Sequence, residues 1–173
     1  HRRHYHPSNA FFYSYGDLPL EDHLAFVARQ VLPRFAAAAP APEVAPQPRW
    51  AAPRTAAAAY PIPPGEDPTK KHQACVAWLA SDVRDTPEVL ALALLDQVLL
   101  GTAAAPLRKA LIDSGLGAAL SDGSGYDPEP RDTRFAAGLK EVRAGDEEAV
   151  EGIVLDTLGR LAAEGIEPER IEA

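Results

Sequence analysis

Three histidines at the start of the chain carry the side chains best suited to metal chemistry. They are His1, His4 and His6, and the first two would share a face if this segment were helical. A catalytic zinc site uses three protein ligands and an open position, usually with a carboxylate base nearby. The sequence contains no H-E-x-x-H pattern, and residues 1–16 contain no acid. We therefore expect a structural or surface role for these histidines and assign no metal ligand.

The other reactive side chains do not form a complete site either. Cys75 lies between apolar residues of a predicted strand, which favours a buried and unreactive thiol. The S-D-G-S-G run at 121–125 lacks the lysine and the following helix of a phosphate loop, so it predicts a turn. Glu147, Glu148 and Glu151 suit a helix start, where acids meet the positive end of the dipole. No G-x-S-x-G elbow is present, and we predict no catalytic, metal-binding or cofactor-binding residue.

Composition excludes several classes of function. The 173 residues carry a net charge of −8, which argues against nucleic acid and against an anionic membrane surface as partners. No apolar run approaches the roughly 20 residues that a membrane-spanning helix needs. A single cysteine cannot form a disulfide within the chain. The hydrophobic fraction of 46% is sufficient for a packed core.

The first 35 residues have the pattern of a strand followed by a helix. The aromatic run at 10–15 predicts a strand. Apolar residues at helical spacing predict an amphipathic helix over 19–32. One strand and one helix cannot form a sheet layer alone, so we expect this piece to belong to a neighbouring domain.

Residues 36–69 are rich in alanine and proline, which favours an extended linker between two domains. Residues 54–60 allow a short strand within it. A proline motif that binds a recognition domain is the alternative interpretation of this stretch, and the sequence favours the linker.

The next part of the chain predicts a buried strand and two helices. The strand within 70–84 is apolar on both faces, so we expect it to be central and covered. The next predicted helix has Thr86 as its cap and Pro87 in its first turn, and Gly101 ends it. It is apolar on nearly every side, which predicts that it is covered all round. Pro106 begins a shorter helix, and Gly115 and Gly117 end it.

The last part predicts two strands and a helix. The strands fall within 118–126 and 133–139, and the second is expected to be half-buried. The helix runs from 146 to 164. Residues 70–173 thus predict an α+β fold, a β-α-β-β-α unit with helices on one face of an antiparallel sheet. The predicted organisation is 1–35 from one domain, a linker over 36–69, and a second domain over 70–173.

Several motifs carry a family resemblance. H-Y-H-P-S-N-A at 4–10 precedes P-L-E-D-H-L at 19–24, and P-L-R-K-A-L-I-D-S-G-L-G at 106–117 precedes G-Y-D-P at 125–128. R-F-A-A-G-L-K-E-V follows at 134–142 and E-G-I-E-P-E-R-I-E-A at 164–173. In order and spacing these stretches resemble the presequence protease subfamily of the pitrilysin and insulinase zinc metallopeptidases, the M16 family. The resemblance covers nearly the whole chain and is weakest in the proline-rich stretch.

The resemblance implies that the parent protein is a zinc endopeptidase that degrades unfolded peptides in a closed chamber. It implies that the H-x-x-E-H motif and a further glutamate ligand precede residue 1. It also implies that the assisting arginine and tyrosine follow residue 173. We therefore expect an inactive internal fragment that joins the end of domain one to most of domain two and forms part of the chamber wall. The zinc and the remaining domains would then be the cofactor and the partners of the parent.

The same resemblance implies a cytoplasmic location in a bacterium and a mitochondrial or plastid location in a eukaryote. The alternative function is a self-standing α/β interaction module without enzymatic activity, which could self-associate through an exposed sheet edge.

Overall fold

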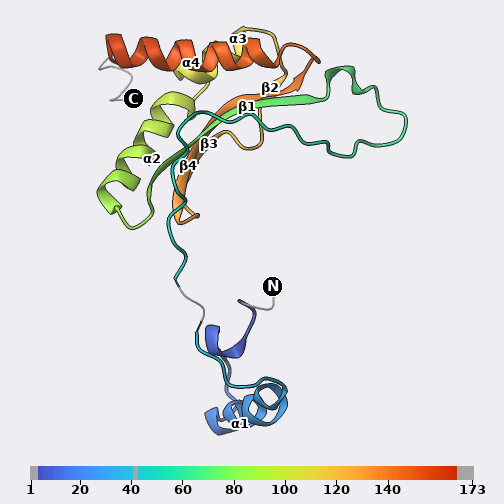
Figure 1. The fold of residues 1–173 in the computed structure, drawn as a ribbon, viewed down its shortest axis with the longest axis vertical. Helices are drawn as coiled ribbons and strands as arrows, with labels where there is room; N and C mark the ends of the chain where they lie inside the picture. Colours follow the sequence, from blue (N-terminus) through green and yellow to red (C-terminus); the bar gives the residue numbers. More distant parts are fainter. Residues whose placement is uncertain (1–3, 41–42, 167–173) are drawn as a thin grey trace. The chain divides into compact units, whose positions relative to one another are not determined.

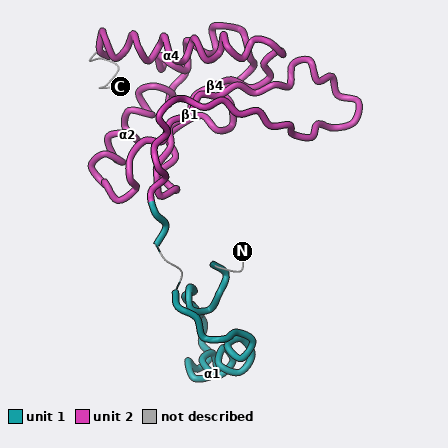
Figure 2. Tube along the Cα trace, in the orientation of Figure 1, with its two compact units in different colours: residues 1–45 teal, residues 46–173 magenta. Residues whose placement is uncertain are grey.

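The computed structural model describes residues 4–40 and 43–166, and these divide into two compact units. The first unit is His1–Ala45 and the second is Pro46–Ala173 (Figure 2). The second unit therefore includes residues 46–69 of the proline-rich stretch.

The first unit contains helices and extended chain. The 3₁₀ helix η1 is Pro7–Asn9, and α1 is Leu20–Phe26. Helix α1 continues as a π-helical turn, η2 (Val27–Val31), and a 3₁₀ turn, η3 (Leu32–Arg34). The helix predicted over 19–32 is therefore confirmed in position, whereas the strand predicted over 10–15 is wrong. No described strand lies beside those residues to accept their backbone hydrogen bonds, so the aromatic side chains remain exposed.

The second unit is built on an antiparallel sheet with the strand order β1-β4-β2, and β3 also pairs with β4 (Figure 1). The strands are β1 (His72–Asp82), β2 (Ala119–Leu120), β3 (Gly125–Asp127) and β4 (Asp132–Val142). Strand β4 pairs with β1 on one side and with β2 and β3 on the other. It is therefore the central strand, and β1 lies at the edge of the described sheet.

This arrangement reverses two predictions. The strand within 70–84 was expected to be central and covered, but β1 has an exposed face that includes Cys75 and Ala77. The strand within 133–139 was expected to be half-buried, but Ala136 and Ala137, on opposite faces of β4, are both fully buried. The number of partner strands decides burial here, and apolar composition does not show which strand has two.

Three helices accompany the sheet: α2 (Thr86–Leu100), α3 (Pro106–Asp113) and α4 (Glu147–Glu164). Each contributes to one core cluster with the sheet, through Leu99 from α2, Leu107 from α3 and Val150 from α4. The element order confirms the predicted β-α-β-β-α unit of an α+β fold, with its second strand divided into β2 and β3. None of the described helices combines the length and the apolar character that crossing a membrane requires.

Helix α2 differs from the prediction in its cap and its burial. Asp85 caps it instead of Thr86, because the Asp85 carboxylate accepts a hydrogen bond from the Glu88 N–H at 3.3 Å. The helix was expected to be covered all round, yet Leu90 and Leu94 are each 60% exposed. Only the inward side of α2 packs into the described core.

The proline-rich residues from 46 onward run beside β1 in the second unit (Figure 1). Arg49 donates a hydrogen bond to the Ala80 carbonyl at 2.9 Å, and the Tyr60 hydroxyl donates one to the Lys71 carbonyl. These two contacts fix the segment antiparallel to β1. The short strand allowed at 54–60 does not form, and a 3₁₀ helix, η4 (Pro68–Lys70), leads into β1.

Candidate functional site

The described histidines do not form a metal site. His6 is occupied on both ring nitrogens, with Ser8 Oγ at 2.8 Å and the Ala36 carbonyl oxygen at 3.1 Å. His4 is exposed, and His1 lies outside the described residues. Among residues 4–40 and 43–166, no group of three histidine, cysteine or acidic side chains lies close enough to hold a metal ion. The residues that the structure describes therefore do not fit a zinc ion.

The single cysteine lies on the open face of the sheet. Cys75 was predicted to be buried, but its side chain is exposed. The prediction failed because β1 alternates its side chains between the helix-covered face and the other face, and Cys75 points away from the core residue Ala74. No helix among the described residues covers Gln73, Cys75 or Ala77.

We define the open face by the residues that β1 and β4 place opposite one another. Gln73, Cys75 and Ala77 of β1 pair with Lys140, Gly138 and Ala136 of β4. The two halves of this face differ in exposure. Gln73, Cys75 and Ala77 of β1 are exposed, whereas Ala136 and Gly138 of β4 are buried, so only the β1 half offers a surface to another polypeptide.

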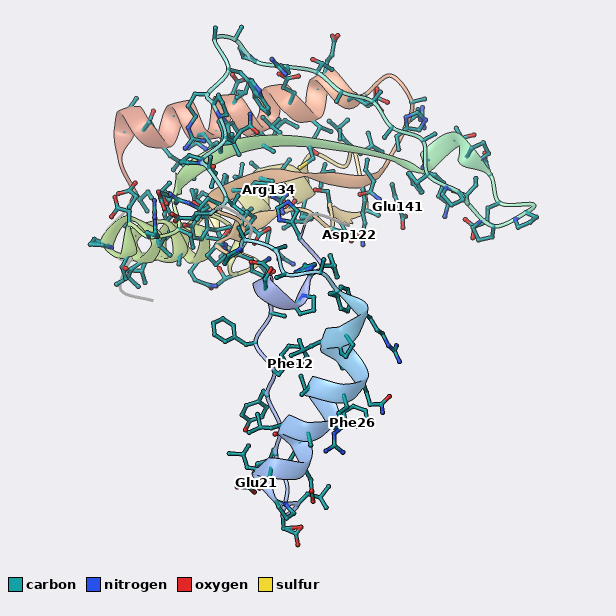
Figure 3. The ribbon with its side chains drawn as sticks, turned by 60° about the horizontal axis from the view of Figure 1, so that its bottom comes forward. Phe12, Glu21, Phe26, Asp122, Arg134 and Glu141 are labelled. Atoms are coloured by element: carbon teal, nitrogen blue, oxygen red, sulfur yellow. The ribbon has the colours of Figure 1, made fainter. Side chains whose placement is uncertain are left out.

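Two ion pairs, Arg134–Asp127 and Lys140–Asp122, mark the ends of the open face along β4. Figure 3 labels one member of each pair, Arg134 and Asp122. At one end Arg134 donates to Asp127 at 3.2 Å and to the Gly123 carbonyl at 3.4 Å. At the other end the Lys140 ammonium lies 2.5 Å from Asp122. The spacing of these two bases, six residues apart on one strand, places both on the same face.

The electrostatics of these pairs favour the charged forms. Hydrogen bonds from the Glu129 N–H and then from Arg134 lower the pKa of Asp127. The hydrogen bond to Asp122 raises the pKa of Lys140. Both shifts favour the charged forms of Asp127 and Lys140, one at each end of the open face.

The S-D-G-S-G run is a turn, as predicted, and it supports the central strand. Ser121 and Ser124 share a hydrogen bond at 2.8 Å, and the Ser124 hydroxyl accepts from the Gly138 N–H at 3.2 Å. Asp122 and Gly123 form the bend between β2 and β3. The hydroxyls thus serve backbone pairing beside β4.

The glutamates at the start of α4 have structural partners. The Glu147 carboxylate accepts a hydrogen bond from the Gly145 N–H at 2.8 Å, and His72 Nδ1 lies 2.8 Å from it. The pKa of Glu147 is lowered mainly by a hydrogen bond from its own backbone N–H. The hydrogen bond from the Gly145 N–H and the interaction with His72 lower it further. Glu148 and Glu151 are exposed on α4. As predicted, these acids lie at a helix start.

Two features were missed from the sequence. A pocket of about 280 Å³ is lined by Lys70, Leu116, Glu141 and Arg143, among others. Glu141 has a backbone φ of 58°, at an irregularity where β4 has one more residue than β1. The charge pattern of Arg134 and Lys140 could have been found from strand alternation, but no sequence signal identifies the bulge.

The comparisons with known proteins agree over the full chain. The model of the "Peptidase M16 inactive domain" matches residues 1–173. The mitochondrial presequence protease of Xenopus laevis is 39% identical over the whole chain, and presequence protease 1 of Arabidopsis thaliana is 40% identical. A Clostridium perfringens protein named HypA is 32% identical, also over the whole chain.

The matched part is a minor share of each relative, since the chain spans about 17% of the Xenopus laevis protein, 16% of the Arabidopsis thaliana protein and 18% of the Clostridium perfringens protein. The matches confirm the resemblance to presequence proteases and support a non-catalytic domain. The chain belongs to the peptidase M16 family, within which it matches the inactive domain.

Proposed function

We propose that this chain is a supporting part of a longer zinc-dependent endopeptidase of the presequence protease type. The observation that carries this proposal is the match of the inactive domain to residues 1–173, together with presequence protease relatives along the whole chain. The zinc and the groups that cleave the peptide belong, in this proposal, to other domains of the same polypeptide. No residue of this sequence is assigned to the zinc.

The proposed role of the second unit is to form part of a wall around the peptide substrate. The open face supports this role because its β1 half, Gln73, Cys75 and Ala77, is exposed. Exposed Cys75 and Ala77 offer apolar contact, and the ion pairs of Arg134 and Lys140 lie at the two ends of the face along β4. A wall needs a surface without a specific pocket, since an unfolded peptide can present any sequence.

The first experiment compares the 173-residue chain with the longer polypeptide that its gene encodes. We expect the longer polypeptide to bind about one zinc ion and to cleave a fluorogenic peptide, and the 173-residue chain to do neither. Metal analysis and a cleavage assay on untagged protein measure both. Stoichiometric zinc and peptide turnover in the 173-residue chain, lost on mutating His1 and His4, would refute the proposal.

A second experiment tests the wall in the longer polypeptide. Ala77→Trp places a large ring on the open face, and we expect it to reduce kcat/KM for a long peptide more than for a short one. Ala149→Trp, at an exposed position of α4, is the matched control and should leave both values unchanged. Equal behaviour of the two variants would contradict a substrate-facing role for the open face.

The alternative is a self-standing interaction module, and the exposed aromatic side chains of the first unit favour association of some kind. Phe12 and Phe26 are among these side chains, labelled in Figure 3. Size-exclusion chromatography with light scattering separates the two functions. A stable dimer of the 173-residue chain would favour the self-standing interaction module. A monomer would favour the proposal that the chain is a non-catalytic part of a larger enzyme.

A further inference from the structure

Helix α2 carries an apolar outward face that residues 46–166 of the second unit do not cover. Its exposed leucines are Leu90 and Leu94, each 60% exposed, and Leu95 at 42%. Leu90 and Leu94 are four residues apart and so lie one above the other on the helix surface. With Ala91, also exposed, they form what we call the leucine face.

Helix α4 of the same unit shows what a solvated helix looks like in this chain. Its exposed positions include Glu148, Glu151, Asp156 and Arg160, and Leu155 is a single exposed leucine among them. The leucine face has no such charges, because no charged residue lies between Glu88 and Asp96. A surface helix normally has charged or polar residues opposite its buried side, so α2 lacks the outer surface of a helix that faces water.

The chemistry of the leucine face restricts its partner. Helices that lie on a membrane surface carry lysine and arginine on their polar side, and α2 contains neither. Leucines at i and i+4 form the ridge that packs into the groove of another helix. The fitting partner is therefore an apolar helix face of another protein segment.

The relatives indicate where such a segment comes from. The chain spans about 17% of the Xenopus laevis presequence protease, so most of that protein lies outside the matched part. We propose that the leucine face of α2 packs against an apolar helix from another part of the same longer polypeptide. This inference rests on the proposed function for the existence of that polypeptide.

Thiol labelling tests the packing. Leu90→Cys and Leu94→Cys are made separately in the 173-residue chain and in the longer polypeptide, with Leu155→Cys on α4 as the matched control. Peptide mass spectrometry then reads the rate of maleimide labelling at each position, after circular dichroism has checked folding. In the longer polypeptide we expect the labelling rate at positions 90 and 94 to be at least about tenfold lower than in the 173-residue chain. Position 155 should label at the same rate in both.

The other possible labelling results refute either the packing of the leucine face or the proposed function. Equal labelling of position 94 in the two polypeptides refutes the packing. Slow labelling in the 173-residue chain that becomes faster on dilution identifies a second copy as the partner and also refutes it. Zinc content and cleavage are measured on the same preparations, so protected positions in a zinc-free, inactive polypeptide refute the proposed function and leave the packing intact.

Discussion

Gly138 of β4 illustrates how one residue sets the spacing of the sheet. A Cβ atom added at this position would lie 2.0 Å from the Ala74 carbonyl oxygen and 2.6 Å from the Cys75 Cα. Both neighbours are backbone atoms of the paired strand and cannot rotate away. We expect Gly138→Ala to destabilise the fold by roughly 3 kcal/mol or more, because β1 and β4 must separate. Thermal unfolding followed by circular dichroism measures the loss.

Gly159→Ala is the control for this prediction. Gly159 is exposed within α4, and an added Cβ would have no neighbour within 4 Å. Alanine is the better helix former, so we expect this variant to gain about 0.5–1 kcal/mol in unfolding free energy. If both variants lowered stability equally, the close approach at Gly138 would not be the cause.

Asp96 predicts a dependence of stability on pH. Burial raises its pKa, and the Tyr126 N–H, which donates to it, only partly offsets this. Among the described residues, Asp96 Oδ1 and the Tyr126 hydroxyl are buried without a hydrogen-bond partner. A carboxyl group whose pKa is higher in the folded state than in the unfolded state stabilises the folded state when it is protonated. That contribution is lost as the pH rises through the pKa that Asp96 has in the folded state.

The test is Asp96→Asn, measured by thermal unfolding across pH. At pH 7 we expect this variant to melt roughly 1–3 °C above the unchanged chain, because the uncharged amide needs less solvation. The difference should shrink as the pH falls and Asp96 of the unchanged chain becomes protonated. A difference in Tm that is independent of pH would assign the effect to packing instead of charge.

At the scale of elements, the proline-rich stretch behaves as part of the second unit. Asp132 is only 9% exposed and accepts a hydrogen bond from the Gln47 N–H at 2.6 Å, while Arg49 lies 3.3 Å from it. Asp132→Asn keeps the shape and removes the charge that holds both groups. We expect a loss of roughly 1.5–3 kcal/mol, the range for hydrogen bonds to a charged group, and faster tryptic cleavage after Arg54.

Asp122→Asn serves as the matched control for this change. Asp122 is also paired, with Lys140, but its side chain is largely exposed, so we expect little loss of stability. Cleavage after Arg54 should stay at the rate of the unchanged chain. If cleavage accelerated equally in both variants, Asp132 would not be the anchor of residues 46–60.

At the scale of the whole molecule, the division at Ala45 and Pro46 predicts which truncations preserve the second unit. A polypeptide of residues 46–173 should melt within about 2 °C of the 173-residue chain, since it keeps the Asp132 contacts. A polypeptide of residues 70–173 should melt lower, since it loses Gln47, Arg49 and Tyr60. Equal melting of these two truncations would show that residues 46–69 contribute nothing to the fold.

The sequence predicted much of the architecture because its signals are local. Helical spacing, proline starts and glycine stops located α3 and α4 and identified α2 as a helix, and the element order gave the β-α-β-β-α unit. Motifs such as H-Y-H-P-S-N-A pointed to the M16 family, which the comparisons confirmed. Most wrong predictions concerned partners: the strand at 10–15, the burial of Cys75 and the covering of α2. The cap of α2, Asp85 instead of Thr86, was a local error.

What only the tertiary structure decided is which apolar surfaces find a neighbour. Strand β1 and helix α2 are both apolar enough to be buried on every side, and the described residues of the second unit cover each on one side only. The sequence by itself determined that these elements form, because backbone geometry and side-chain periodicity act over a few residues. Coverage depends on groups far apart in the chain, such as Asp132 and Arg49 or Ala74 and Gly138, and their meeting is a property of the folded molecule.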